Sequence, residues 1–267
     1  MPMKKTALVL ATFGTKHDQE EDFVTNMQRA LETRCPGTDV FIAFTSKLVS
    51  QERRKKGQAG NALAQILSEL SASGYTHVAV QSLHVVPGLE FDMLKDITAR
   101  FADMPKGIRK TGAGFPLIHD DQSAERLAGA LLSSLPATRK PEEAVVFVGH
   151  GSHTPSGTLA YPALQAFLWQ KDPNVFVGTV EGALTPEKIL DQVKAKGAST
   201  VWLNPLLAFY GTHVMEDIFG EGKSWQTLFA QNGITCVPIH ETLLARPEAV
   251  AMWTDNAVQT LEDLTAE

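Results

Sequence analysis

The sequence predicts an α/β fold made of two similar lobes, each a small parallel sheet flanked by helices. Short, nearly continuous apolar runs alternate with helical segments, and the motifs of the first half return in the same order in the second half. Continuous apolar runs are typical of strands whose two faces are both covered, as in a parallel sheet. Alternation of strands and helices favours right-handed βαβ units. A length of 267 residues allows one large domain or two small ones.

The elements follow from these runs in order. Strands are predicted at residues 7–11, 40–44, 77–81, 145–148, 175–179, 201–203 and 235–238. Helices are predicted, for example, at residues 20–33, 62–71, 124–133, 186–196 and 247–261. The first apolar run is too short for an export signal and leads into Phe13 and Gly14 as a strand leads into a turn. No run approaches the roughly 18 residues that cross a membrane, so we expect a cytoplasmic protein with no membrane partner.

The two halves share four features in the same order. A strand ends in a glycine turn at residues 13–15 and again at 150–152, and similar second strands follow. Pro87-Gly88-Leu89-Glu90 then aligns with Tyr210-Gly211-Thr212-His213, and residues 115–119 resemble 237–240. We predict an N-terminal lobe at residues 1–125 and a C-terminal lobe at 126–267, with the link near residues 120–141.

Composition excludes several classes of protein. The net charge of -6 argues against a nucleic-acid partner, since such domains are usually basic. Cys35 and Cys236 form no C-x-x-C pair, so we expect free thiols rather than a zinc knuckle. No P-loop, nucleophile elbow or G-x-G-x-x-G motif is present, and no nucleotide or other organic cofactor is implied.

Three residues of the second half follow predicted strands in the same register. His150, Glu181 and His213 are separated by 31 (181 − 150) and 32 (213 − 181) residues, about one βαβ unit each. Ligands of open parallel sheets bind beyond the carboxyl ends of the strands. Two imidazoles and one carboxylate there are plausible ligands for a divalent transition metal. Taken singly, each residue also fits an ordinary turn or helix start; their joint register favours a site.

The equivalent positions of the first half are Phe13, Ser46 and Glu90, of which only Glu90 is ionisable. His84 lies just after the strand predicted at residues 77–81 and is a candidate for substrate contact. The basic run at residues 53–56 is consistent with two interpretations, a solvated helix or loop face and a binding patch for a polycarboxylate.

At these motifs the chain resembles the class II tetrapyrrole chelatases, most closely the sirohydrochlorin cobaltochelatases of anaerobic cobalamin biosynthesis. The resemblance covers essentially the whole chain. It rests on residues 10–15, 43–46, 81–90, 149–153 and 211–213. It implies two α/β lobes with the active-site cleft between them. The family's metal-binding histidines fall on His150 and His213, its cleft glutamate on Glu90 and its second-lobe carboxylate on Glu181.

The resemblance implies insertion of Co²⁺ into sirohydrochlorin with release of two protons, the metal being a substrate. His150, Glu181 and His213 would hold the metal, and Glu90 would receive a pyrrole proton or orient the ring. One of the two histidines could instead be the base. His84, Ser46 and Phe13 are the expected substrate contacts.

Three alternatives stay open at this point. Iron insertion for sirohaem uses the same chemistry, and Irving–Williams ordering does not identify the physiological metal. A metal-dependent hydrolase would use the same His–Glu–His set with an open coordination position. A metal or tetrapyrrole carrier would bind without turnover. The chain also leaves a homo-oligomer open.

Overall fold

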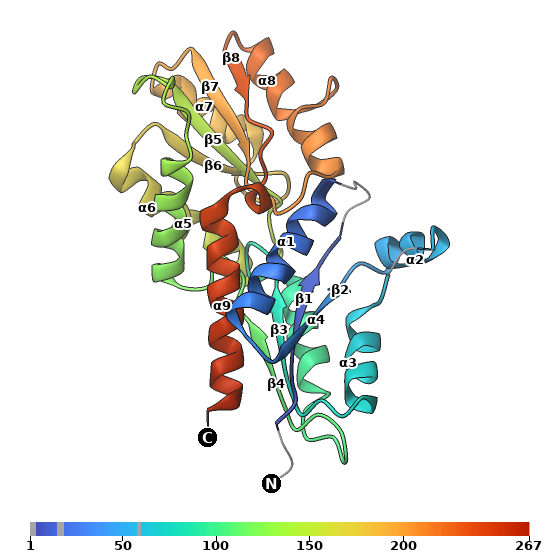
Figure 1. Ribbon diagram of the computed structural model, residues 1–267. Coiled ribbons are helices and arrows are strands. Elements are labelled where there is room, and N and C mark those ends of the chain that lie inside the picture. The colour runs from blue at the N-terminus through green and yellow to red at the C-terminus, as the bar shows by residue number, and fades with distance from the viewer. Residues whose placement is uncertain (1–3, 15–18, 58–59, 267) are drawn as a thin grey trace. The chain divides into compact units, whose positions relative to one another are not determined.

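The computed structural model describes residues 4–14, 19–57 and 60–266. These residues form two compact units, each built on a four-stranded parallel sheet with flanking helices (Figure 1). The predicted α/β class with two similar lobes is therefore confirmed.

The first unit comprises the described residues of Met1–His84, Leu89–Pro116 and Val250–Glu267. Its strand order is β2-β1-β3-β4. The strands are β1 (Thr6–Thr12), β2 (Thr38–Phe44), β3 (His77–Ser82) and β4 (Lys110–Gly114). Its helices are α1 (Gln19–Arg34), α2 (Lys47–Lys55), α3 (Leu63–Ala72), α4 (Leu89–Ala99) and most of α9 (Pro247–Thr265).

The second unit comprises Val85–Gly88 and Leu117–Ala249. Its strand order, β6-β5-β7-β8, repeats that of the first unit. The strands are β5 (Ala144–Gly149), β6 (Val175–Thr179), β7 (Thr200–Pro205) and β8 (Thr235–Pro238). Its α-helices are α5 (Asp121–Ser133), α6 (Pro155–Lys171), α7 (Pro186–Ala195) and α8 (Trp225–Gln231). Two short helices, η1 (His213–Ile218, a π-helix) and η2 (Leu243–Ala245, a 3₁₀-helix), complete it.

Burial explains why the strands form where the apolar runs predict them. Every residue of β3, β5 and β6 is buried, and β1 is buried from Ala7 to Thr12. Because both faces of such a strand are covered, its sequence is apolar at consecutive positions. The seven predicted strands and the five predicted helices are all present, with ends shifted by a few residues.

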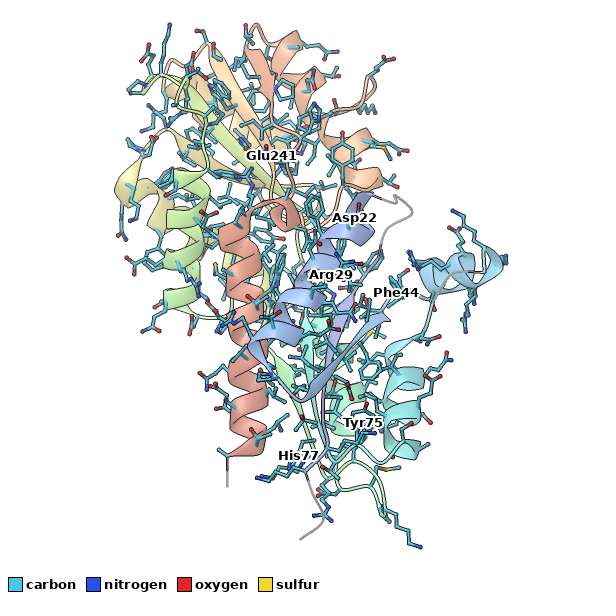
Figure 2. All side chains as sticks on the ribbon, viewed as in Figure 1. Asp22, Arg29, Phe44, Tyr75, His77 and Glu241 are labelled. Atoms are coloured by element: carbon cyan, nitrogen blue, oxygen red, sulfur yellow. The ribbon has the colours of Figure 1, made fainter. Side chains whose placement is uncertain are left out.

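The carboxyl ends of the parallel strands define one edge of each sheet. In the first unit Phe44 ends β2 and pairs with Thr12, while His77 begins β3 and pairs with Thr6. Phe44 and His77 thus mark the two opposite edges of this sheet (Figure 2). Within this unit, the predicted site residues Phe13 and Ser46 follow strand ends at the edge that Phe44 marks.

The strand β4 was not predicted, and its glycines are the reason. Its sequence, KTGAG, lacks the apolar run that indicates a buried strand. A Cβ on Gly112 would lie 3.1 Å from Thr260 Cγ2 and 3.3 Å from Leu264 Cδ1, so the missing side chains let α9 lie close against the strand. Glycine at these positions lets α9 pack closely, although glycine has a low intrinsic propensity for β-strands.

The predicted lobe boundary between residues 125 and 126 falls inside α5, which belongs whole to the second unit. The units also differ from two contiguous lobes, because α9 follows β8 in the chain but belongs to the first unit from Val250 onward. Side-chain contacts hold α9 there: Arg34 Nη2 lies 2.9 Å from Asp255 Oδ1, and Asn256 Nδ2 donates to Phe115 O at 3.1 Å. The sequence pattern within either half does not predict that the helix after the last strand of one unit belongs to the other unit.

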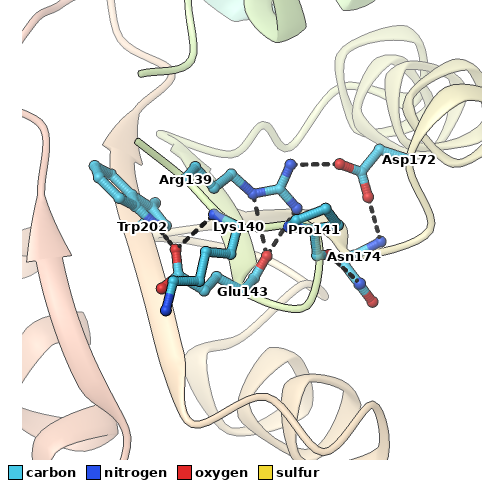
Figure 3. A network of polar contacts seen from close by, with 7 residues as sticks. All are labelled: Arg139, Lys140, Pro141, Glu143, Asp172, Asn174 and Trp202. Carbon is cyan, nitrogen blue, oxygen red and sulfur yellow. Dashed lines mark hydrogen bonds and ion pairs between the residues drawn. The ribbon is translucent and has the colours of Figure 1, made fainter. Parts of the chain in front are cut away.

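A polar network closes the amino edge of the second sheet (Figure 3). Arg139 donates to the carbonyl oxygen of Glu143 and to Asp172 Oδ2. Trp202 Nε1 on β7 donates to Glu143 Oε2 at 2.7 Å, and Asn174 Nδ2 donates to a backbone carbonyl of the same loop. The loop that precedes β5 is therefore fixed to β7 and to the turn between α6 and β6.

In the part of the chain that the structure describes, no helix has the length and apolar character that crossing a membrane requires.

Candidate active site

The predicted site residues occupy matching places in the two units. Phe13 and His150 directly follow β1 and β5, and Ser46 and Glu181 lie two residues beyond β2 and β6. Glu90 and His213 both lie eight residues beyond the third strand of their units, β3 and β7 (90 − 82 and 213 − 205). The internal repeat therefore extends to the strand-end positions that carry the candidate chemistry.

The turn that carries His150 depends on the glycines that flank it. Gly151 has a φ of 98°, and a Cβ there would lie 2.1 Å from the backbone oxygen of Glu181. A Cβ on Gly149 would lie 2.4 Å from the Tyr161 ring. Tyr161 Oη accepts a hydrogen bond from the Gly151 N–H at 3.1 Å, and the Glu181 N–H donates to His150 O at 2.9 Å. The close backbone approach suggested by the two glycines is thus made to the Glu181 backbone and to Tyr161.

The structure brings the two predicted metal-binding histidines together. The ring centroids of His150 and His213 are 4.6 Å apart, and the rings are nearly perpendicular at 89°. An imidazole nitrogen binds a divalent transition metal at about 2.1 Å, which places each ring centroid about 3.2 Å from the ion. Two rings that share one ion at about 90° then have centroids about 4.5 Å apart. The observed spacing fits a shared ion.

His213 has a carboxylate partner that the sequence analysis missed. Its Nδ1 lies 2.6 Å from Asp217 Oδ2, four residues further along η1. A carboxylate one helical turn after a candidate ligand is the signal that could have found it. Both side chains are partly exposed, 42% for His213 and 40% for Asp217.

The Glu181 carboxylate has a different partner. Its Oε2 lies 3.1 Å from His153 Nε2, and the side chain of His153 is 82% exposed. Within residues 4–14, 19–57 and 60–266, no three His, Cys, Asp or Glu side chains are gathered as a set of metal ligands. Of the predicted ligands the structure pairs His150 with His213, and the role of Glu181 stays a prediction.

The predicted site residues of the first unit lie at the strand and helix ends of that unit. Phe13 is 49% exposed. Ser46 caps α2, because its Oγ accepts from the Val49 N–H at 3.3 Å. Glu90 is exposed in the first turn of α4, where the helix dipole favours a carboxylate. Ser46 is therefore the N-cap of α2, and substrate contact there stays a prediction.

His84 is held from several sides. Its Nδ1 lies 2.7 Å from Ser82 Oγ, which also accepts from the His84 N–H at 3.2 Å. The carbonyl oxygen of His84 accepts from Trp253 Nε1 at 3.1 Å. Burial lowers the pKa of His84 to about 4, although the Glu90 carboxylate acts in the opposite direction. The ring is therefore neutral at pH 7, and its Nε2 is buried without a hydrogen-bond partner among the described residues.

A buried imidazole nitrogen without a partner loses its hydration and gains nothing in return, so it calls for a functional or structural explanation. A ligand that approaches His84 Nε2 would supply the missing bond. This is the feature of the structure that best supports the predicted substrate contact.

The basic run ends α2. Arg53, Arg54 and Lys55 lie in its last turn, where cations stabilise the carboxyl end of a helix. The Arg53 guanidinium also lies over the Phe44 ring, 4.7 Å from its centroid. These contacts support the structural interpretation of the run; binding of an anionic substrate there stays a prediction.

Comparison with known sequences places these residues in context. A family model described as cobalt chelatase (CbiK) matches residues 6–262. The sirohydrochlorin cobaltochelatase CbiKC of Nitratidesulfovibrio vulgaris (strain Hildenborough) is 36% identical over 268 residues, covering 98% of this chain and 94% of that protein. The sirohydrochlorin cobaltochelatase of Salmonella typhimurium (strain LT2) is 32% identical over 262 residues, covering 96% and 97%.

Solved structures show a similar fold. The sirohydrochlorin chelatase SirB of Bacillus subtilis subspecies spizizenii, in complex with cobalt, has a TM-score of 0.68 at 17% identity, covering 98% of this chain and 97% of that one. SirB from Bacillus subtilis with Fe³⁺ has the same TM-score at 13% identity and the same coverage. At such identities the likeness extends to the fold alone.

Proposed function

The chain belongs to the CbiK family of cobalt chelatases, and we propose that it inserts Co²⁺ into sirohydrochlorin with His150 and His213 as the metal ligands. The balanced reaction exchanges one Co²⁺ for the two protons of the inner pyrrole N–H groups. The protein must therefore hold a partly dehydrated metal ion, hold the macrocycle and give two protons a way out.

The spacing of the two imidazoles is the observation that carries this proposal. Their centroids are 4.6 Å apart, close to the value of about 4.5 Å expected for two rings that share one ion. Neutral imidazole is a suitable ligand for Co²⁺. Two protein ligands leave positions open for water and then for the ring nitrogens.

Glu181 is proposed as a third metal ligand, whose carboxylate would leave His153 and bind the metal ion instead. The pair is exposed, with 82% of the His153 and 46% of the Glu181 side chain accessible. Exposed ion pairs contribute at most about 1 kcal/mol. A divalent cation can therefore outcompete His153 for the carboxylate, and the added negative charge would balance the ion.

Glu90 is proposed as the acceptor of a pyrrole proton. It is exposed in the first turn of α4, so a proton received from the macrocycle can pass on to water. His84 is proposed to contact the macrocycle through Nε2, the buried atom without a partner in the described residues. Phe13 and Ser46 remain proposed substrate contacts, on their strand-end positions alone.

Family membership decides among the alternatives. A hydrolase or a non-catalytic carrier would not be expected to match a cobalt chelatase model over residues 6–262. The two relatives described above are named for cobalt rather than iron. We also propose a cytoplasmic site of action, which the free thiols Cys35 and Cys236 support, since thiols persist in reducing compartments.

The test follows metal insertion by the absorbance of the macrocycle. Purified protein is mixed with sirohydrochlorin and either Co²⁺ or Fe²⁺, and the rate is compared with the spontaneous reaction. We expect His150→Ala and His213→Ala each to reduce cobalt insertion by at least about 100-fold, the scale of losing a metal ligand. His119→Gln, which changes a histidine that is not among the proposed site residues, is the matched control and should keep the wild-type rate. Wild-type rates in either alanine variant would overturn the ligand assignment.

A further inference from the structure

We propose that Asp217 is a positioning residue, which holds the imidazole of His213 in the tautomer that presents Nε2 to the metal. The inference rests on the proposed function, because it concerns how one of the two ligands is prepared. It adds a residue to the site that the pattern of strand ends does not reveal.

The contact itself dictates the tautomer. His213 Nδ1 lies 2.6 Å from Asp217 Oδ2, the distance of a strong, charge-assisted hydrogen bond. An ionised carboxylate can only accept, so the proton of this bond sits on Nδ1. In the neutral ring Nε2 then keeps its lone pair, which is the form that binds a metal.

The π-helix η1 sets the two side chains side by side. Its wide turn is closed by the Phe219 N–H, which donates to Val214 O at 3.1 Å. Val214 and Ile218 are fully buried and anchor the turn, whereas His213 and Asp217 precede these anchors by one residue each and stay partly exposed. Single π-helical turns occur frequently at functional sites. The buried anchors fix the backbone, so the Asp217 carboxylate stays within reach of the ring.

The two proposed ligands are prepared differently. Among the described residues, no hydrogen bond to the imidazole of His150 is present, and Glu181, the carboxylate that follows the neighbouring strand β6, pairs with His153 instead. His213 is thus oriented before the metal arrives. Hydrogen bonding to a carboxylate also makes the imidazole a stronger donor to the ion. Loss of such a partner typically weakens metal binding by about 10- to 100-fold.

The first measurement reads the tautomer directly, without metal or macrocycle. Long-range ¹H–¹⁵N correlation spectra at about pH 8, above the ordinary imidazole pKa of about 6.5, distinguish protonated from bare ring nitrogens. We expect His213 to carry its proton on Nδ1 in the wild type. In Asp217→Ala we expect a mixture of tautomers or the Nε2–H form. An unchanged Nδ1–H tautomer in Asp217→Ala would overturn the proposal.

The second measurement is Co²⁺ binding by the metal-free enzyme, followed by calorimetry and by the visible absorbance of the bound ion. Asp217→Ala should bind Co²⁺ about 10- to 100-fold more weakly, and Asp217→Asn by less, since an amide oxygen still accepts from Nδ1–H. Glu216→Gln removes a neighbouring exposed carboxylate of the same helix and should leave the affinity unchanged. Equal losses in Glu216→Gln and Asp217→Asn would indicate a general effect of charge and would contradict positioning.

The outcomes separate this inference from the proposed function. If the wild type inserts cobalt and depends on His213, but Asp217→Ala binds Co²⁺ normally, the positioning role fails while the function stands. If His213→Ala itself binds and inserts cobalt normally, the ligand assignment fails, whatever Asp217 does. Circular dichroism and thermal unfolding of each variant establish that a loss of affinity is not a loss of fold.

Discussion

Acid should destabilise the protein through His84, and the effect can be worked out from its pKa. The folded-state pKa of about 4 lies below the ordinary value of 6.5, because burial disfavours the charged ring. As the pH falls below 6.5 the unfolded chain binds this proton before the folded protein does. The stability that depends on the neutral ring is therefore complete above about pH 6.5 and is lost progressively down to about pH 4.

The size of the effect follows from the two pKa values. A difference of about 2.5 pKa units corresponds to about 3.4 kcal/mol between full deprotonation and full protonation. Lowering the pH from 7.5 to 5 should reduce the free energy of unfolding by about 2 kcal/mol through His84. Because the residue as a whole remains partly exposed while its Nε2 is buried, these values are upper limits.

The assay compares urea unfolding of the wild type and His84→Asn at pH 7.5 and at pH 5. Asparagine can keep a hydrogen bond to Ser82 Oγ, where His84 Nδ1 lies at 2.7 Å, but it does not titrate. The contributions of all other titrating groups to the pH dependence of the unfolding free energy are the same in both proteins, so they cancel in the difference. We expect the wild type to lose up to about 2 kcal/mol more than the variant on acidification. An equal loss in both proteins would refute the reasoning.

Three further changes test other parts of the structure. Gly151→Ala places a Cβ against the backbone oxygen of Glu181 at a φ of 98°, so it should lower stability by about 1–3 kcal/mol and reduce Co²⁺ binding. Thermal unfolding and calorimetry measure the two effects, and a wild-type melting temperature would contradict the prediction. Arg139→Met removes the partly buried ion pair with Asp172 and the hydrogen bonds to Glu143 O, and it should cost about 1–3 kcal/mol in urea unfolding, while the rate of cobalt insertion at low temperature stays normal. His153→Gln should release the Glu181 carboxylate and strengthen Co²⁺ binding by up to about fivefold with little change in stability; weaker binding would instead make His153 a ligand.

The strands and the repeat were predictable because they depend on local sequence. Buried parallel strands need apolar residues at consecutive positions, and the glycine turns after β1 and β5 return at Gly14 and Gly151, both with positive φ. The strand β4 was not predicted because its glycines are required by packing against α9, a helix that lies about 150 residues away in the chain. Contacts at such a distance leave no periodic signal within the strand itself.

The site was predictable only in outline, for a related reason. The register of strand ends identifies His150 and His213, which the structure pairs, but a register does not determine which way a side chain turns. Glu181 meets His153, three residues after His150, and that choice depends on the conformation of the glycine turn. The π-helical turn that brings Asp217 to His213 likewise has no sequence signature of its own.

The two units share a strand order but carry different side chains at matching positions. Positions that match in the repeat carry Phe13, Ser46 and Glu90 in one unit and His150, Glu181 and His213 in the other. The strand order that creates these positions is the same in both units, so the backbone alone does not determine the chemistry. Under the proposed function, the side chains at these equivalent positions would let the second unit hold the metal, while the first would contact the macrocycle and accept a proton. Exchanging these residues between units, for example His150→Phe, should therefore remove metal binding while the fold persists, since Phe13 shows that the position accepts an exposed aromatic ring.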